Sequence, residues 1–99
     1  MEIEIEKYFL KIDPNKVLSK IVEERVNRAF SILLLIETII KEKLGKNVES
    51  LNLPLLIGNS VKSQDEKDQF LKLLKERGMK EKDLDFIRKL IEEVYFLIG

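Results

Sequence analysis

The sequence contains no cysteine and no histidine, and these two absences exclude several kinds of functional site. Without cysteine there is no disulfide framework, no thiolate metal site and no thiol nucleophile. Without histidine the usual zinc, haem and non-haem iron ligand sets are missing, as is the commonest general base. We therefore expect a protein that is not an enzyme and that binds no cofactor and no metal.

The chain also lacks a net charge, because 18 basic side chains balance 18 acidic ones over 99 residues. This balance removes the broad electrostatic attraction that dedicated binders of nucleic acid or anionic membranes carry. The charged side chains are mostly lysine and glutamate, which is typical of the surfaces of thermophile proteins. The length predicts one domain, residues 1–99, with a single core.

Long hydrophobic runs are missing as well. The run at residues 32–36 is far shorter than the ~20 apolar residues that cross a bilayer. The opening residues, MEIEIEK, are acidic and alternating, unlike the basic and then apolar order of a secretory signal. We expect a cytoplasmic protein without membrane association.

The strongest positive feature is an apolar stretch at residues 30–40, read FSILLLIETII. It lies inside residues 17–44, which contain no proline and no glycine. Asp13 and Pro14 form a helix start, and Gly45 forms a helix stop. A helix from 14 to 44 that is apolar on several sides must be buried on more than one face.

Two apolar stripes run along this helix. The first has three- and four-residue spacing and comprises Val22, Val26, Ala29, Leu33, Ile36, Ile40 and Leu44, as a core helix requires. The second, Ile32, Leu35 and Ile39, indicates either a central position among other helices or a dimer seam. We expect a homodimer or small homo-oligomer with Ile32, Leu35, Ile36 and Ile39 at its interface, and a different protein partner stays open.

The remaining segments complete the predicted architecture. Residues 1–13 alternate like a short strand or arm, or they extend the helix that follows. Residues 46–62 are rich in turn formers and leucine, which predicts a lid over the core with a short helical turn. Ser63 and Glu66 fit a capping box that opens a helix ending at Arg77 and Gly78. A last amphipathic helix spans 81–98. Its predicted inward stripe is Leu84, Ile87, Ile91, Val94 and Ile98, widened by Phe86, Leu90 and Leu97. The fold class is therefore an all-α bundle of three to four helices around a long central helix.

Acidic side chains offer a weak case for chemistry. Glu92 and Glu93 could join Glu23 and Glu24 in a metal site of the four-helix-bundle kind, but the Glu-x-x-His element of such sites is absent. Charged pairs at helix margins are usually solvated faces. Glu37, although its neighbours are apolar, is predicted to pair with Lys41 one turn later.

A helix-turn-helix around Gly78 is the alternative that involves nucleic acid. It would present basic side chains from the end of one helix and the start of the next, namely Lys75, Arg77, Lys80, Lys82, Arg88 and Lys89. Glu81, Asp83 and Asp85 lie among them and would repel phosphates. An ordinary helical hairpin is the competing interpretation.

The order of these segments resembles the HEPN family of α-helical toxins and RNA-processing proteins. The resemblance rests on the helix bearing VEERVNRAFSILLLIETIIKEKLG, the helix ending LLKERG and the last amphipathic helix. In that family the last helix carries an Arg-x4-His motif, often followed by x-Tyr, which cuts RNA across a dimer interface. Arg88 and Tyr95 match this spacing, but Glu93 replaces the catalytic histidine, and a carboxylate does not reproduce imidazole proton transfer near neutral pH. The resemblance therefore implies an RNA-associated protein without cleavage activity.

The function that the sequence favours is a small non-catalytic interaction or assembly protein that self-associates through its central helix. Its basis is an excess of apolar helix faces combined with the absence of catalytic residue types.

Overall fold

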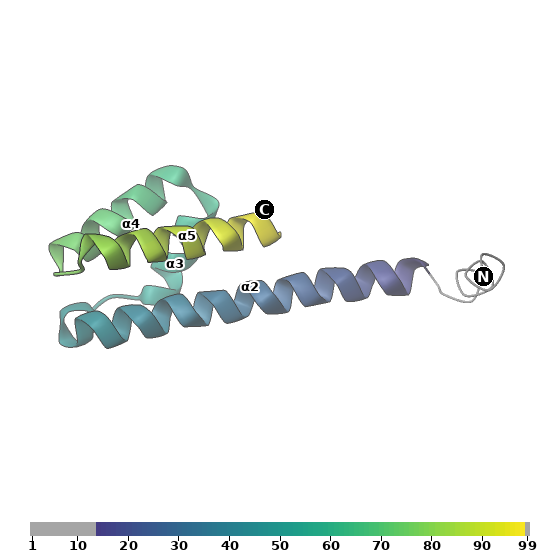
Figure 1. The fold of residues 1–99 in the computed structure, drawn as a ribbon, viewed down its shortest axis with the longest axis horizontal. Helices are drawn as coiled ribbons and strands as arrows, with labels where there is room; N and C mark the ends of the chain where they lie inside the picture. The colour runs from purple at the N-terminus through teal and green to yellow at the C-terminus, as the bar shows by residue number, and fades with distance from the viewer. Residues whose placement is uncertain (1–13, 99) are drawn as a thin grey trace.

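Residues 14–98 form an all-α structure in the computed structural model, as the sequence predicts (Figure 1). The predicted strand or arm at residues 1–13 lies outside the residues that the structure describes. The elements are α2 (Pro14–Leu44), the 3₁₀ helix η1 (Gly45–Val48), α3 (Leu53–Lys62), α4 (Gln64–Glu76) and α5 (Glu81–Ile98). Within residues 14–98, no helix has both the length and the apolar character that spanning a bilayer requires.

Both ends of α2 lie where the local sequence predicts them. The helix begins at Pro14, whose missing N–H is no loss in a first turn. It ends before Gly45, which adopts a φ of 50° that is strained for other residues. The predicted pair between Lys41 and Glu37 is confirmed, since Lys41 Nζ lies 2.9 Å from Glu37 Oε1.

The connection after α2 is more regular than predicted. The segment packs onto the core as predicted, through Leu53, Ile57 and Val61, but it contains the complete helix α3 where only a short helical turn was predicted. Asn52 caps α3 by accepting a hydrogen bond from the backbone N–H of Leu55, and Pro54 occupies the first turn. The apolar residues that suggested a lid therefore form the buried side of a helix.

Ser63 is the junction between α3 and α4. Its hydroxyl oxygen accepts a hydrogen bond from Glu66 N at 3.4 Å, which confirms one half of the predicted capping box. The other half is absent because the Ser63 N–H already donates to Asn59 O in the last turn of α3. Two helices thus share one residue as their boundary, and this fixes α4 against α3.

The bundle consists of two helix pairs. Contacts are most numerous between α2 and α5, which run antiparallel, and between α3 and α4 (Figure 1). The core between the pairs is aliphatic with one phenylalanine, and its completely buried side chains include Ile36, Ile40, Leu74, Ile87 and Val94. This core confirms four residues of the inward stripe predicted for α5, Leu84, Ile87, Ile91 and Val94, whereas Ile98 of the same stripe is half-exposed.

The first stripe predicted on α2 is only partly buried. Ala29, Ile36, Ile40 and Leu44 belong to the core, but Val22 and Val26 are exposed, so their assignment to the core is wrong. The physical reason is length. With 31 residues in α2 and 18 in α5, α2 is roughly 20 Å longer than the helix that covers it.

The turn between α4 and α5 depends on Gly78, whose φ is 108°. The Gly78 N–H donates to Lys75 O, and the Met79 N–H donates to Leu74 O, which closes the end of α4. We expect Gly78→Ala to lower the free energy of unfolding by about 1–3 kcal/mol, because an alanine in this region is strained. Urea denaturation measures the change.

Gly58→Ala is the matched control. Gly58 lies inside α3, and an added Cβ meets no atom within 4 Å. Alanine there should be neutral or stabilise by up to about 1 kcal/mol, since it favours helix. Equal losses at both glycines would contradict the role given to Gly78.

Candidate interaction surface

The structure divides the four predicted interface residues between the core and the surface. Ile36 has no exposed area and belongs to the chain's own core, so its assignment changes from interface to core. Ile32 and Ile39 are half-buried and pack against that core from its edge. Leu35 is 45% exposed. Ile32, Leu35 and Ile39 therefore lie along the edge of the core, and Leu35 is the most exposed of the three.

Apolar side chains of α5 form a second row along the same edge of the core. Arg28 Nη2 donates to Glu93 Oε1 at 3.2 Å, which links the antiparallel helices α2 and α5 on this side of the bundle. Seven residues further along α2 is Leu35, and seven residues back along α5 is Phe86. Because three- and four-residue steps keep side chains on one helix face, both rows border the same edge of the α2–α5 pair.

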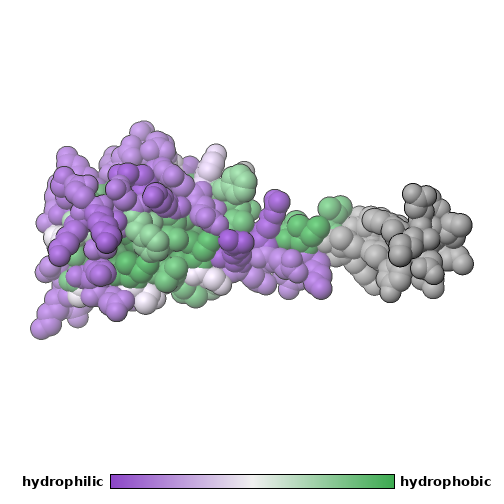
Figure 2. All heavy atoms as spheres, viewed as in Figure 1, coloured by the Kyte–Doolittle hydropathy of each residue, from purple (hydrophilic) through white to green (hydrophobic). Residues whose placement is uncertain are grey.

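We call this surface the α2–α5 strip. It comprises Ile32, Leu35 and Ile39 of α2 with Phe86, Leu90 and Leu97 of α5, and the Arg28–Glu93 pair lies within it. Phe86 is 50% exposed. Figure 2 shows hydrophobic surface between hydrophilic margins on the face that α2 and α5 turn to the viewer.

Sequence reasoning missed the α5 half of this strip. Phe86, Leu90 and Leu97 were predicted to widen the inward stripe of the last helix, and Leu90 and Leu97 do pack at the edge of the core. The exposure of Phe86 depends on where α2 lies. No local pattern carries that information, although the 86, 90, 97 spacing could have suggested a second face.

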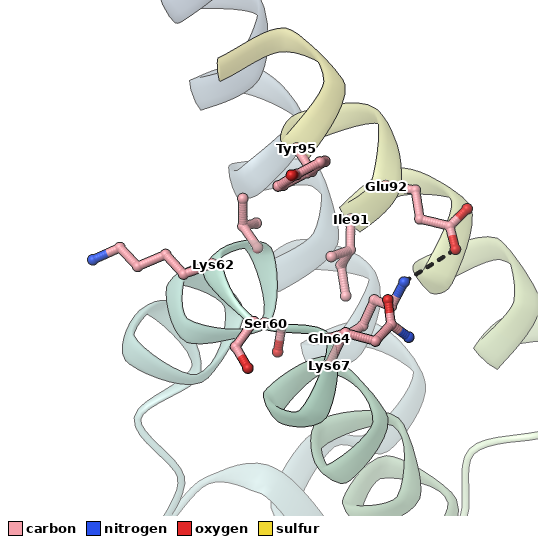
Figure 3. Close-up of a pocket in the computed structure, with 9 residues that line it drawn as sticks. Ser60, Lys62, Gln64, Lys67, Ile91, Glu92 and Tyr95 are labelled. Carbon is pink, nitrogen blue, oxygen red and sulfur yellow. Dashed lines mark hydrogen bonds and ion pairs between the residues drawn. The ribbon is translucent and has the colours of Figure 1, made fainter. Parts of the chain in front are cut away.

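A separate cleft of about 390 Å³ lies where the α3–α4 junction meets α5 (Figure 3). Lys67 extends across it from α4, and its Nζ lies 3.1 Å from Glu92 Oε1 of α5. The Ser60 hydroxyl at its floor donates to Leu56 O, and Tyr95 lies at its rim. The Lys67–Glu92 pair therefore links α4 to α5 across the cleft, and the Ser60 hydroxyl is engaged with the backbone of its own helix.

The carboxylates considered for a metal site are separated by the fold. Glu92 pairs with Lys67 and Glu93 pairs with Arg28, on different sides of α5. Among residues 14–98, no group of three or more acidic side chains is arranged to hold a metal ion.

The residues predicted to contact nucleic acid lie around the α4–α5 turn, and several have internal partners. Lys75 Nζ lies 2.7 Å from Glu81 Oε1, and this hydrogen bond together with the carboxylate charge raises the pKa of Lys75. Arg77 donates to Asn47 O at 2.8 Å, and Arg88 pairs with Asp85 at the same distance. Lys80, Lys82 and Lys89 are exposed among Asp83, Asp85 and Phe86. The arrangement mixes both charge signs, so contact with nucleic acid stays a prediction.

Of the residues that carry the HEPN resemblance, Arg88 and Tyr95 lie on one face of α5 and Glu93 lies on another. Arg88 pairs with Asp85 within α5, whereas Glu93 reaches Arg28 of α2 and Tyr95 is exposed. No family model, curated protein or solved structure that was compared with the chain matches it. The resemblance therefore stays a prediction.

Proposed function

We propose that this protein is a non-catalytic helical interaction module that self-associates through the α2–α5 strip. The observation that carries the proposal is the exposure of Leu35 on α2 and Phe86 on α5, each about half accessible, along the apolar edge of the α2–α5 pair. Clustered apolar surface with a polar rim is typical of protein contact sites. A buried leucine and phenylalanine at the centre would supply most of the binding free energy.

The charges in the strip favour a second copy of the chain as the partner. The side chain of Arg28 is 68% exposed and that of Glu93 is 47% exposed, and such a surface ion pair contributes little to the stability of one chain. In a two-fold arrangement each copy offers the same surface to the other. An axis close to this pair would let Arg28 of one copy reach Glu93 of the other, so the strip is complementary to itself in charge as well as in apolar character.

The test is the molar mass in solution of the wild type and of Leu35→Glu. Wild type should form a dimer or small oligomer at high protein concentration by light scattering. Leu35→Glu should have a lower molar mass than the wild type at the same concentration and remain helical by circular dichroism, because the new carboxylate would be buried without a partner only where two strips meet. Global unfolding of this variant would assign Leu35 to the internal core and contradict the proposal.

Leu34→Glu is the matched control. Leu34 is the same residue type, is 52% exposed and lies one position away, so its side chain points about 100° around the helix from Leu35. This control should keep the oligomeric state of the wild type. The proposal would be contradicted if the wild type were strictly monomeric at high concentration. It would also be contradicted if Leu34→Glu dissociated as readily as Leu35→Glu.

A further inference from the structure

The N-terminal part of α2 carries a second apolar surface, which lies past the end of α5 (Figure 1). We call residues 18–26 the overhang. Leu18 is 60% exposed and Val22 is 59% exposed, and Ile21 and Val26 are about half-exposed beside them. Leu18 and Val22 continue the helix face on which Ala29 and Ile36 are buried. In the overhang, the face of α2 that is buried further along the helix is therefore not covered by any of the described residues.

At the C-terminal end of α5, the inward apolar face of the helix is likewise left uncovered. Leu84, Ile87, Ile91 and Val94 are buried along the inward face of α5, and Ile98 continues that face but is half-exposed. The paired faces thus run beyond the point where α5 stops. Since a single helix gains most of its stability from packing an apolar face, an element that takes over from α5 would stabilise the overhang.

We propose that the occupant is the overhang of a second copy, paired antiparallel with the first. α5 already runs antiparallel to α2, so an antiparallel α2 from another copy has the same direction as α5 and continues its line. When two identical overhangs pair antiparallel, each covers the other over its whole length. This is a two-fold symmetric interface, which closes on itself. A two-fold axis between Leu18 and Val22 places Leu18 of each copy against Val22 of the other.

The charge pattern fits a copy of the same chain. Close to a two-fold axis, each side chain meets its own counterpart, so a charged residue there would repel itself. The residues that flank the axis on the apolar side are Ser19 and Ile21, and neither is charged. Lys20, Glu23 and Glu24 point away from the stripe by their helical positions, and all three are exposed. Arg25 is exposed and lies on the stripe, seven residues after Leu18, and the pairing places it opposite residue 15 of the other copy, which is an asparagine. The pairing therefore buries Leu18, Ile21 and Val22 without opposing like charges.

Cysteine cross-linking tests this pairing directly, because the chain has no cysteine of its own. Leu18→Cys and Val22→Cys variants of the full chain are mixed, incubated to exchange subunits and oxidised under mild conditions. Antiparallel pairing brings residue 18 of one copy within disulfide distance of residue 22 of the other. We expect the mixed disulfide to exceed the proportion that random pairing gives. An excess of the two homodisulfides would indicate parallel pairing and overturn the inference.

Lys20→Cys is the control for random collision, since residue 20 lies on the opposite side of the helix. Cross-linking of the Leu18 and Val22 variants no faster than this control would also overturn the inference. The inferred pairing of overhangs rests on the proposed function only because both need a second copy of the chain. To separate the two, the cross-linking is repeated with Leu35→Glu added to both cysteine variants. The mixed disulfide should persist there, because the overhang lies outside the α2–α5 strip. Loss of the disulfide only when Leu35→Glu is present would show that the overhang is not an independent surface and would overturn the inference. The molar mass of the Leu35→Glu variant tests only the α2–α5 strip.

Discussion

Ile36→Ala should lower the free energy of unfolding by about 2–5 kcal/mol, because it opens a cavity at the centre of the bundle. Ile36 has no exposed area and lies on the face of α2 that packs against the rest of the core. The loss combines the transfer free energy of the missing methyl and methylene groups with the contacts that their neighbours lose. Urea denaturation with an unchanged m-value would report this as a loss of stability.

The control for this prediction is Leu34→Ala, two positions before Ile36. Leu34 is about half-exposed, and a substitution on such a surface usually changes stability by no more than about 0.5 kcal/mol. Both variants should be measured at the same low protein concentration, because self-association also stabilises the folded state. If Ile36→Ala cost no more than Leu34→Ala, Ile36 would not be a core residue and its original assignment to an interface would return.

The second large effect is expected at the ion pair between α4 and α5. The side chain of Lys67 is only 9% exposed, whereas that of its partner Glu92 is 53% exposed. Glu92→Ala should destabilise by about 1–3 kcal/mol, because it leaves a buried ammonium group without its hydrogen-bond partner. Lys67→Met should cost less, since methionine fills the same space and the Glu92 carboxylate remains hydrated.

A double-mutant cycle measures this asymmetry. The variant with both Lys67→Met and Glu92→Ala should be more stable than Glu92→Ala alone, because no buried charge is then left unpaired. The cycle also tests the interpretation of the cleft as a junction between helices. Equal losses from both single variants would mean that the Lys67 ammonium reaches water without Glu92, which would contradict its burial.

Local sequence signals predicted the helices well. The start of α2 at Pro14, its end before Gly45, and the bounds of α4 and α5 all follow from caps and breakers that act over a few residues. The prediction was wrong where such signals compete. In residues 46–62, several turn formers were given more weight than the apolar spacing of what proved to be α3, whose first turn Asn52 and Pro54 set.

The candidate surface was only partly predictable for a different reason. Periodicity gives the angle of a side chain around its helix, but it does not give the length or the position of the neighbouring helix. Ile36 and Val22 therefore belonged to one predicted stripe, yet α5 covers the first and ends before the second. In the same way Leu35 and Ile36 were both assigned to an interface, and their separation into surface and core depended on the placement of α5.

By itself, then, the sequence determined the all-α class, the bounds of the long helices and the residue types available for chemistry, because these depend on composition and on interactions within a few residues. Only the tertiary structure decided which apolar faces are covered. That outcome depends on the 13-residue difference in length between α2 and α5 and on where α5 lies along α2. Burial is a property of pairs of helices, and a periodic pattern describes one helix at a time.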